Sequence, residues 1–184
     1  MVAGSTPPPL LTDRLRLRQW QDGDREPFAA MTADPLVMAH FAARLDRAES
    51  DRRVDRLSAG IAERGWGFWA VEVRSTGAFA GFVGLSPVPD HLPCAPGVEL
   101  GWRLATPFWG QGYATEGARR AVAYGFDELG LSELIAFTTR QNLPSQRVMQ
   151  KLGMTTDPAD DFEHPDHPDW DERACVVYRL PASR

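Results

Sequence analysis

The chain has 184 residues, of which 43% are hydrophobic and 24% are charged, and its formal net charge is −5 at pH 7. These values predict one globular domain that needs no disulfide or metal to hold its core, and they disfavour a nucleic acid as the main partner. No stretch approaches the ~20 apolar residues that span a bilayer, and the N-terminal residues contain no signal-peptide core. The two cysteines form no CxxC pair, which fits a reducing compartment. We therefore expect a cytoplasmic protein without a membrane partner.

The first half of the chain predicts two helices and a group of antiparallel strands. Alternating apolar and polar residues indicate a half-buried strand, whereas apolar residues three and four apart on a polar stretch indicate an amphipathic helix. Aromatic and β-branched runs on both sides of a Ser-Thr-Gly turn indicate a hairpin. In chain order we expect a disordered proline-rich tail (1–9), a strand (15–20), a short helix capped by Asp22 or Asp24 and ending near Thr32, a helix (50–64) ending near Gly65, and two hairpin strands (66–74 and 79–85).

The second half predicts a strand–helix–strand crossover. Small apolar residues along one face of its long helix would let that helix pack closely on a sheet. Antiparallel strands followed by a crossover predict a mixed sheet with helices on both faces, in the α/β (α+β) class. The expected elements are an irregular proline-rich loop (86–97), a strand (98–104), a helix (112–129) ended by Gly130, a strand (134–139), a helix opened by Asn142 and Pro144 and ended by Gly153, and a closing strand (174–180).

The stretch WGQGYATEGARR, residues 109–120, places Gly110 and Gly112 between the predicted strand and the long helix. The free N–H groups and dipole of a helix's first turn attract an anion, and glycines let phosphate oxygens approach the backbone. The loop therefore favours a bound phosphate, with a plain tight turn as the equally weighted alternative. A nucleotide-binding protein is disfavoured, because neither Gly-Lys-Ser/Thr nor a completed GxGxxG follows.

Four stretches, in order, carry a resemblance over nearly the whole chain: LLTDRLRLRQW, GFWAVEVRSTGAFAGFVGL, VELGWRLATPFWGQGYATEGARRAVAYGF and NLPSQRVMQKLGM. They resemble the GNAT superfamily of acyl-CoA-dependent N-acetyltransferases, and more narrowly its RimJ/RimL branch, which acetylates ribosomal-protein N-termini. Gly112 and Ala114 match the last two fixed positions of the superfamily pattern Arg/Gln-x-x-Gly-x-Gly/Ala, while Trp109 replaces its first residue. The resemblance implies one GNAT domain over residues 10–184: a mixed, mostly antiparallel sheet with splayed parallel strands and helices on both faces.

The resemblance also implies that the anion is the pyrophosphate of coenzyme A, held by the backbone amides of residues 110–115. Pantetheine would lie between two splayed strands and pair with backbone groups of Arg103 and Leu104. The side chain of Asn142 would bind it too; the alternative role of Asn142, a helix N-cap, is compatible with this one. Acetyl-CoA would be the co-substrate, with no metal. The expected cofactor-binding residues are Arg103, Leu104, Trp109, Gly110, Gln111, Gly112, Tyr113, Ala114, Thr115, Asn142 and Ser145.

The expected chemistry is direct attack of a primary amine on the thioester, so a proton must leave an amine that is largely protonated at neutral pH. Glu99 is the candidate general base, acting through water, because it lies near the place where GNAT enzymes keep a catalytic glutamate. Partial burial would raise its pKa; an ion pair with an arginine such as Arg103 is the alternative. A backbone N–H near Leu104 would stabilise the oxyanion. Ser145, in an Asn-x-x-Ser element similar to that of the RimJ/RimL branch, would assist the departing thiolate, or would bond local backbone instead.

The acceptor side is less well specified by the sequence. His40 and Phe41 fall between the first helices, a segment that covers the acceptor in similar folds, and Trp69 belongs to an aromatic cluster that is mostly core. These three are the expected substrate residues. Residues 157–172 carry eight acidic residues and no lysine or arginine. They either attract a cationic amine beside the acceptor site or form a solvated surface loop.

Further residues receive no catalytic role. His164 and His167 lie among prolines with no rigid helix to align ligands, so a metal site is disfavoured. Cys94 is interpreted as a loop thiol and Cys175 as a small buried residue. The acceptor is expected to be a small amine or a protein N-terminus, and the protein a monomer or homodimer. A non-catalytic acyl-CoA binding or sensing module on the same fold is the alternative function, which the candidate base and serine disfavour.

Overall fold

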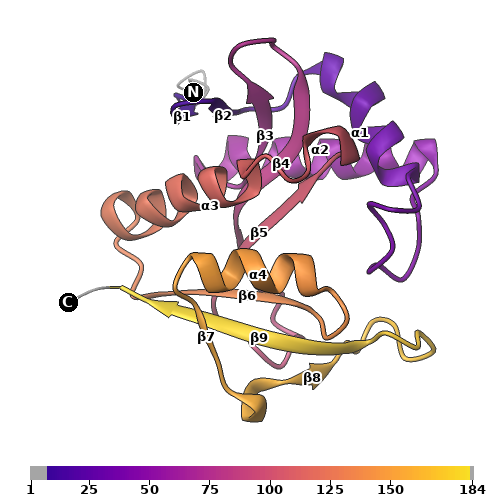
Figure 1. Cartoon of the computed structure of the whole chain (residues 1–184), viewed down its shortest axis with the longest axis vertical. Helices are drawn as coiled ribbons and strands as arrows, with labels where there is room; N and C mark the ends of the chain where they lie inside the picture. Colours follow the sequence, from indigo (N-terminus) through magenta and orange to yellow (C-terminus); the bar gives the residue numbers. More distant parts are fainter. Residues whose placement is uncertain (1–7, 183–184) are drawn as a thin grey trace.

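One sheet runs through the part of the chain that the computed structural model describes, residues 8–182. Figure 1 shows helices α1, α2 and α3 around strands β1 to β5, and α4 beside strands β6 to β9. The strands are β1 (Leu10–Leu11), β2 (Leu15–Arg18), β3 (Phe68–Val73), β4 (Phe79–Pro87), β5 (Val98–Leu104), β6 (Glu133–Thr139), β7 (Thr155–Thr156), β8 (Phe162–Glu163) and β9 (Ala174–Pro181). The helices are α1 (Arg25–Ala33), α2 (Arg47–Arg64), α3 (Tyr113–Ala123) and α4 (Leu143–Lys151).

The sheet is mixed, as the sequence predicts, and one parallel contact joins its two halves. The strand order is β1-β2-β3-β4-β5-β6-β9-β7, with β8 paired to β9. Every neighbouring pair is antiparallel except β5 and β6, which share a single register contact between Glu99 and Ile135. Beyond that contact the two strands diverge towards their carboxyl ends, so β1–β5 and β6–β9 form two halves of the molecule (Figure 1).

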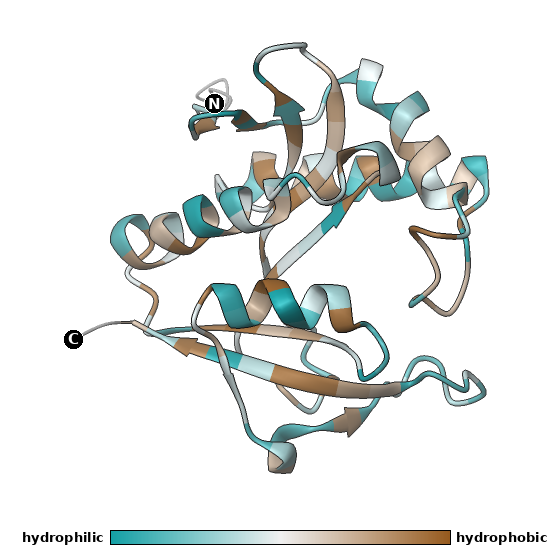
Figure 2. Ribbon diagram, in the orientation of Figure 1, coloured by the Kyte–Doolittle hydropathy of each residue, from teal (hydrophilic) through white to brown (hydrophobic). Residues whose placement is uncertain are grey.

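Neighbouring residues on the central strands point to opposite faces and therefore meet different helices. On β4, Phe82 lies near Phe28 of α1, with ring centroids 6.4 Å apart. Val83 faces α3, where a Cβ atom at Gly117 would come within 3.3 Å of its Cγ2 atom. α1 therefore covers one face of this half-sheet and α3 the other. Figure 2 shows the hydrophobic residues gathered along the central strands between these helices.

Local signals decide where α2 begins and ends. The Asp46 side chain accepts a hydrogen bond from the Glu49 N–H, and the Glu49 side chain accepts one from the Asp46 N–H. This capping box lies upstream of the apolar stripe on which the prediction rests, so the helix begins at Arg47 rather than at residue 50. Gly65 ends it in the left-handed conformation, with a φ of 82°, where glycine is favoured.

The other long predicted elements are confirmed, with shifts at their ends. The hairpin forms β3 and β4, and the crossover forms β5, α3 and β6. The predicted helix 112–129 is α-helical only to Ala123 and continues as a π-helical turn, Tyr124–Glu128, before Gly130. The two-residue strands β1, β7 and β8 were too short for alternation to show in the sequence.

The two ends of the chain add little to this comparison. Of the predicted proline-rich tail, residues 1–7 lie outside the described part of the chain. Across residues 8–182, none of the helices has the length and apolar character that crossing a membrane requires.

The close approach of β3 and β4 yields a stability prediction at Gly84. A Cβ atom there would collide with the Gly67 carbonyl oxygen and lie 2.8 Å from the Trp69 ring. We expect Gly84→Ala to lower the free energy of unfolding by about 2–3 kcal/mol, because both neighbours are rigid parts of the sheet. Gly23→Ala is the matched control, because no atom lies within 4 Å of its Cβ position. Urea unfolding of both variants checks this, and equal midpoints would contradict the packing described.

Candidate active site

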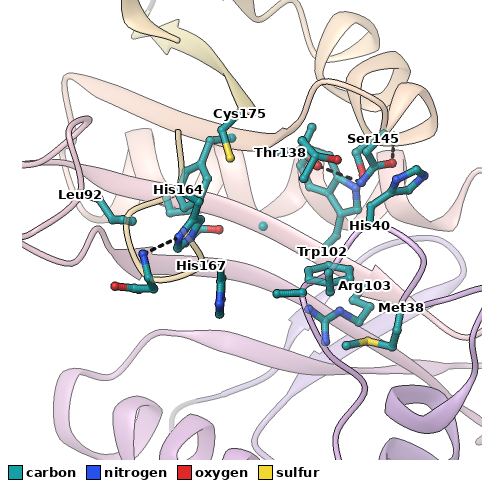
Figure 3. Close-up of a pocket in the computed structure, with 18 of the residues that line it drawn as sticks. Met38, His40, Leu92, Trp102, Arg103, Thr138, Ser145, His164, His167 and Cys175 are labelled. Carbon is teal, nitrogen blue, oxygen red and sulfur yellow. Dashed lines mark hydrogen bonds between the residues drawn. The ribbon is translucent and has the colours of Figure 1, made fainter. Parts of the chain in front are cut away.

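A cavity of about 470 Å³ lies where β5 and β6 diverge. Its walls come from segments that are far apart in the sequence: the loop after α1, helix α2, strands β3 to β6, the start of α4 and the acidic segment 157–172. Figure 3 shows His164 and Cys175 towards one side of the view and Ser145 and Arg103 towards the other. Both halves of the molecule therefore contribute side chains to one cavity.

The loop between β5 and α3 presents a run of unpaired backbone N–H groups. Gly110 and Gly112 have φ values of 72° and 80°, in the left-handed region that favours glycine. Within residues 8–182, the N–H groups of residues 110–115 have no hydrogen-bond acceptor, and the first backbone bond of α3 runs from the Glu116 N–H to the Gly112 carbonyl at 3.0 Å. With the helix dipole behind them, these N–H groups are suited to hold an anion.

Two side chains of the loop hold its own backbone in shape. The Trp109 indole N–H donates to the Leu104 carbonyl oxygen at 2.7 Å, and the Gln111 amide donates to the Pro107 carbonyl oxygen at 2.8 Å. Trp109 and Gln111 therefore shape the loop with their side chains, which the sequence pattern did not predict. Their backbone N–H groups remain in, or next to, the unpaired run.

Arg14, in the turn between β1 and β2, clamps the same loop from outside. It donates to the Gln111 carbonyl oxygen at 2.9 Å and forms an ion pair with Glu116 at 2.6 Å. Desolvation alone would raise the pKa of Glu116, but hydrogen bonds from Thr12 and Arg14 lower it overall. The guanidinium also lies 4.7 Å from the centre of the Tyr113 ring. Sequence reasoning missed Arg14, because the contact joins positions 102 residues apart with no local signal.

Glu99 lines the cavity, and its residue is half-buried. Burial raises the pKa of Glu99 to about 7, while the positive charges of Arg53 and Arg103 act in the opposite direction. Its Oε1 atom lies over Gly101, where a Cβ atom would approach it to 3.2 Å, so the glycine leaves room for the carboxylate. The alternative expectation, a direct ion pair with Arg103, is not met: no such contact forms within 4 Å among the described residues. A carboxyl group with this pKa is suited to exchange a proton near neutral pH.

Asn142 and Ser145 lie at the start of α4, where that helix meets the cavity. The Asn142 side chain is buried and already uses both ends: its oxygen accepts from the Ser145 N–H at 3.2 Å, and its nitrogen donates to the Thr138 hydroxyl at 2.8 Å. The N-cap role is thus observed. The Ser145 hydroxyl makes no hydrogen bond within the described chain, although its alternative role requires one to local backbone. It is therefore available to a ligand.

His40 and Phe41 lie in the wall of the cavity, as expected for acceptor-side residues. The His40 Nδ1 atom is 3.1 Å from Glu172 at the end of the acidic segment. The Phe41 ring stacks on Arg103, with the guanidinium carbon 3.7 Å from the ring centre. The loop after α1 therefore contacts the acidic segment through His40 and strand β5 through Phe41.

The acidic segment borders the cavity, and arginines neutralise part of its charge. Three of its eight acidic residues form ion pairs with arginines, two more contact histidines, which are charged only when protonated, and His164, Asp166, His167 and Trp170 line the cavity. The field that would attract a cationic amine is therefore weaker than the composition suggests. The pairs are Asp160–Arg179, Asp161–Arg140, Glu163–Arg173, Asp166–His91 and Glu172–His40.

The two histidines of this segment stack rather than bracket a metal. The His164 and His167 ring centres are 5.1 Å apart. Burial, followed by the charge of His167, lowers the pKa of His164. Among residues 8–182, no group of three or more His, Cys, Asp or Glu side chains has an arrangement that could hold a metal ion.

Comparison with known proteins decides the family. A family model described as an acetyltransferase (GNAT) domain matches residues 14–155. The chain belongs to the GNAT acetyltransferase family. The Bacillus subtilis protein YkkB is 34% identical over 148 residues, covering 79% of this chain and 84% of that protein. The FsC-acetyl coenzyme A-N(2)-transacetylase of Aspergillus fumigatus is 36% identical over 155 residues, covering 80% of this chain and 65% of that protein.

A solved structure shows the same fold. The acetyltransferase from Agrobacterium tumefaciens superposes with a TM-score of 0.78 at 26% identity, covering 95% of each chain. The GNAT fold predicted from the sequence is therefore confirmed, and the protein is an N-acetyltransferase.

One expected substrate residue of this N-acetyltransferase does not reach the cavity. Trp69 is only 2% exposed and packs edge-to-face on Tyr124, on the α3 side of the sheet. Its neighbour Phe68 lines the cavity instead, together with Phe82. The alternation along a strand requires that one of the two adjacent aromatics faces the cavity, but the sequence does not say which.

Both cysteines of the enzyme lie where the sequence predicts. Cys94 is in the loop between β4 and β5, where it is buried, at 6% exposure, in a small apolar cluster with Ile135 and Val177. Cys175 is buried as expected, and burial raises the pKa of its thiol to about 11. Neither thiol is prepared to act as a thiolate nucleophile.

The buried carboxyl group of Glu99 predicts a pH-dependent stability. Because its pKa in the folded chain, about 7, exceeds the ordinary value of 4.5, the folded state holds this proton more tightly than the unfolded state. The resulting stabilisation is complete below about pH 4.5 and disappears as pH rises through 7. We expect Glu99→Gln to be more stable than the wild type at pH 8, by about 2 kcal/mol, and nearly equal to it at pH 5. Urea unfolding at both pH values measures this. The exposed Glu63→Gln serves as control, and a pH-independent difference would contradict a buried, titrating Glu99.

Proposed function

We propose that this enzyme transfers the acetyl group of acetyl-CoA to a primary amine by direct attack, with Glu99 as general base. The observation that carries the proposal is a pairing of two features on one strand–loop unit: Glu99 lies on β5 and lines the cavity, and β5 leads into the loop of free N–H groups before α3. A run of free N–H groups at residues 110–115 is suited to a diphosphate, and a carboxyl group with a pKa of about 7 lies in the gap between β5 and β6. The name of the Aspergillus relative, an acetyl coenzyme A-N(2)-transacetylase, supports an acetyl donor and a nitrogen acceptor.

On the donor side, the N–H groups of residues 110–115 would bind the diphosphate of coenzyme A. Its pantetheine arm would enter the gap beyond the Glu99–Ile135 contact, where β5 has no partner strand on its β6 side. Backbone groups of Arg103 and Leu104 would pair with the arm as a strand does. The Leu104 carbonyl already accepts from Trp109 and retains one lone pair for a second donor.

On the acceptor side, the amine must lose a proton to become a nucleophile. An alkyl amine with a pKa near 10.4 is mostly protonated at pH 7, and an α-amino group near 8 much less so. Glu99, unprotonated above about pH 7, takes the proton through a water molecule in the cavity. The amine nitrogen then forms a bond to the acetyl carbon, the carbon–sulfur bond breaks, and the products are an N-acetyl amide and the free thiol.

Two further groups would serve the transition state. A backbone N–H near Leu104 would donate to the oxyanion of the tetrahedral intermediate. The Ser145 hydroxyl, which has no partner within the described chain, would donate to the departing sulfur. No covalent intermediate is needed, because the amine attacks the thioester directly.

The finer classification is part of the same proposal. The motifs around Trp109 and Ser145 support a place in the RimJ/RimL-like branch, which acts on protein N-termini. The cavity, about 470 Å³ and lined in part by aromatic side chains, also has room for a small amine. We propose that the enzyme works in the cytoplasm.

The diphosphate site is tested at Gly112. We expect Gly112→Asp to weaken coenzyme A binding at least about tenfold, because a carboxylate would face the phosphates and a Cβ atom would crowd the loop. Gly77→Asp is the matched control, since Gly77 also has a positive φ, 71°, but lies in the β3–β4 turn. Isothermal titration calorimetry with coenzyme A measures both. The proposal fails if the wild type binds no coenzyme A at millimolar concentration, or if both variants bind it equally.

The catalytic step is tested by pH-rate profiles. We expect Glu99→Gln to lower kcat by about 10²- to 10⁴-fold, since general-base catalysis contributes that much. In the wild type the rate should rise with pH up to about 7, as Glu99 loses its proton, and the variant should lose this inflection. Ser145→Ala should lower kcat by about tenfold without moving the inflection. Thiol release from acetyl-CoA with a panel of amines and N-terminal peptides provides the rate, and a Glu99→Gln variant with wild-type kcat and profile would exclude Glu99 as base.

A further inference from the structure

Two arginines line the cavity without a carboxylate partner. Arg53 comes from α2 and Arg103 from β5, and neither forms a hydrogen bond or an ion pair within 4 Å among the described residues. The Arg103 Nε atom is fully buried and has no acceptor. Other arginines of the described chain that lack an ion pair, such as Arg44 and Arg52, are exposed to solvent. A buried donor with no acceptor is costly, so this pair needs an explanation.

The charges in this part of the cavity do not balance. Burial, followed by the mutual repulsion of the two guanidinium groups, lowers the pKa of Arg103 to about 9, and burial also lowers the pKa of Arg53. Glu99 supplies at most one negative charge against these two positive ones, and with a pKa of about 7 it is only partly ionised at neutral pH. Buried charges are normally compensated, so the site lacks at least one negative charge.

No other acid of the cavity contacts these arginines. Asp166, which also lines the cavity, contacts His91 at 3.1 Å, and Glu172 contacts His40 at 3.1 Å. Glu49, which lines a second pocket together with Arg53, accepts a hydrogen bond from the Asp46 N–H in the helix cap. Glu99 is the carboxylate whose charge acts on the pKa values of both Arg53 and Arg103, so a bound anion is suited to supply the remaining negative charge.

The position of Arg103 distinguishes this ligand from the diphosphate. Arg103 lies on the same strand face as Glu99, with the side-chain-free Gly101 between them. Its guanidinium is held against Phe41 at 3.7 Å and faces Phe82 at 5.6 Å, on the α1 side of the sheet. The free N–H groups of residues 110–115 begin α3, which covers the opposite face. The N–H groups of residues 110–115 thus lie on the side proposed for the donor, and the two arginines lie on the side proposed for the acceptor.

We propose that the acceptor is an amine of the amino-acid class, whose carboxylate is bound by Arg53 and Arg103 while its amino group faces Glu99. This inference rests on the acetyl transfer proposed above. A planar carboxylate matches the fork of a guanidinium, and the charge-assisted hydrogen bonds would satisfy the orphaned Arg103 Nε. The aromatic walls, Phe41, Phe68, Phe82 and Phe137 among them, favour an apolar body for this acceptor.

The test compares matched acceptors that differ only in the carboxylate. Phenylalanine, leucine and methionine are each measured against their carboxamides, by thiol release from acetyl-CoA at pH 8. We expect kcat/KM to be at least about tenfold higher for the acid than for the amide, because the charge-assisted contacts are lost in the amide. The amino group of the carboxamide is less protonated than that of the acid, so intrinsic reactivity favours the carboxamide. A higher kcat/KM for the acid would therefore reflect recognition of its carboxylate.

The arginine variants identify the groups responsible. Arg103→Gln and Arg53→Gln should each bring the acid-to-amide ratio close to one, chiefly by raising KM for the acid. Arg56→Gln removes an exposed positive charge from the same helix outside the cavity and should leave the ratio unchanged. Arg103→Lys should restore part of the ratio, which separates loss of the charge from misfolding. Calorimetric binding of N-acetylphenylalanine and its amide in the presence of coenzyme A gives the same comparison without turnover.

Each result decides between named outcomes. An acid-to-amide ratio near one in the wild type, or an equal loss for both acceptors in Arg103→Gln, overturns the inference while the acetyl transfer stands. Faster turnover of N-terminal peptides than of any amino acid overturns it in favour of a protein acceptor. A tenfold loss of coenzyme A affinity in Arg103→Gln assigns the arginine to the donor instead. If the wild type does not bind coenzyme A, the proposed function fails and the inference fails with it.

Discussion

The whole site depends on the point at which two parallel strands cease to pair. β5 and β6 share one register contact, at Glu99 and Ile135, and then separate. Beyond it, alternate residues of both strands have backbone groups on the inner edge without a strand partner, which a folded protein tolerates only where water or a ligand takes over. The cavity is therefore a consequence of sheet topology, and a strand-like ligand arm is the natural occupant of the gap.

The strand that borders this gap also separates two kinds of electrostatic environment. The carboxyl end of β5 leads into the loop of free N–H groups at the start of α3, which is held in shape by Trp109 and by Arg14 from a distant turn. The face of β5 that points towards α1 and α2 carries Glu99 and Arg103, which have no direct ion-pair partners. The first environment is built from backbone dipoles and is open to solvent. The second is built from buried side-chain charges, where low polarity strengthens each interaction and shifts each pKa.

Burying these charges lowers stability in exchange for reactivity. A carboxyl group that titrates near neutral pH and a guanidinium with an orphaned donor each destabilise the empty protein, whereas the most buried charged side chains of the described chain, Arg18 and Asp24, are paired. The buried Arg18, for example, is bound by Asp24 at 2.7 Å and by Glu72 at 2.8 Å. Such unsatisfied groups are expected where a ligand completes the structure, because nothing in folding alone selects for them.

The sequence by itself determined the long elements, the mixed sheet and the glycine loop between β5 and α3, which follow from short-range patterns: hydrophobic period, caps and glycine positions. Its resemblance to the GNAT family added Glu99 and Ser145 as candidates. Tertiary structure alone decided that Phe68 rather than Trp69 faces the cavity, that Arg14 clamps the loop, and that arginines pair with part of the acidic segment. It also decided that Arg53 and Arg103 share a cavity without a carboxylate in direct contact. The reason is physical: alternation along a strand fixes that neighbours point to opposite faces but not which face is open, and the pairing of charges depends on distances between residues that only the folded chain brings together.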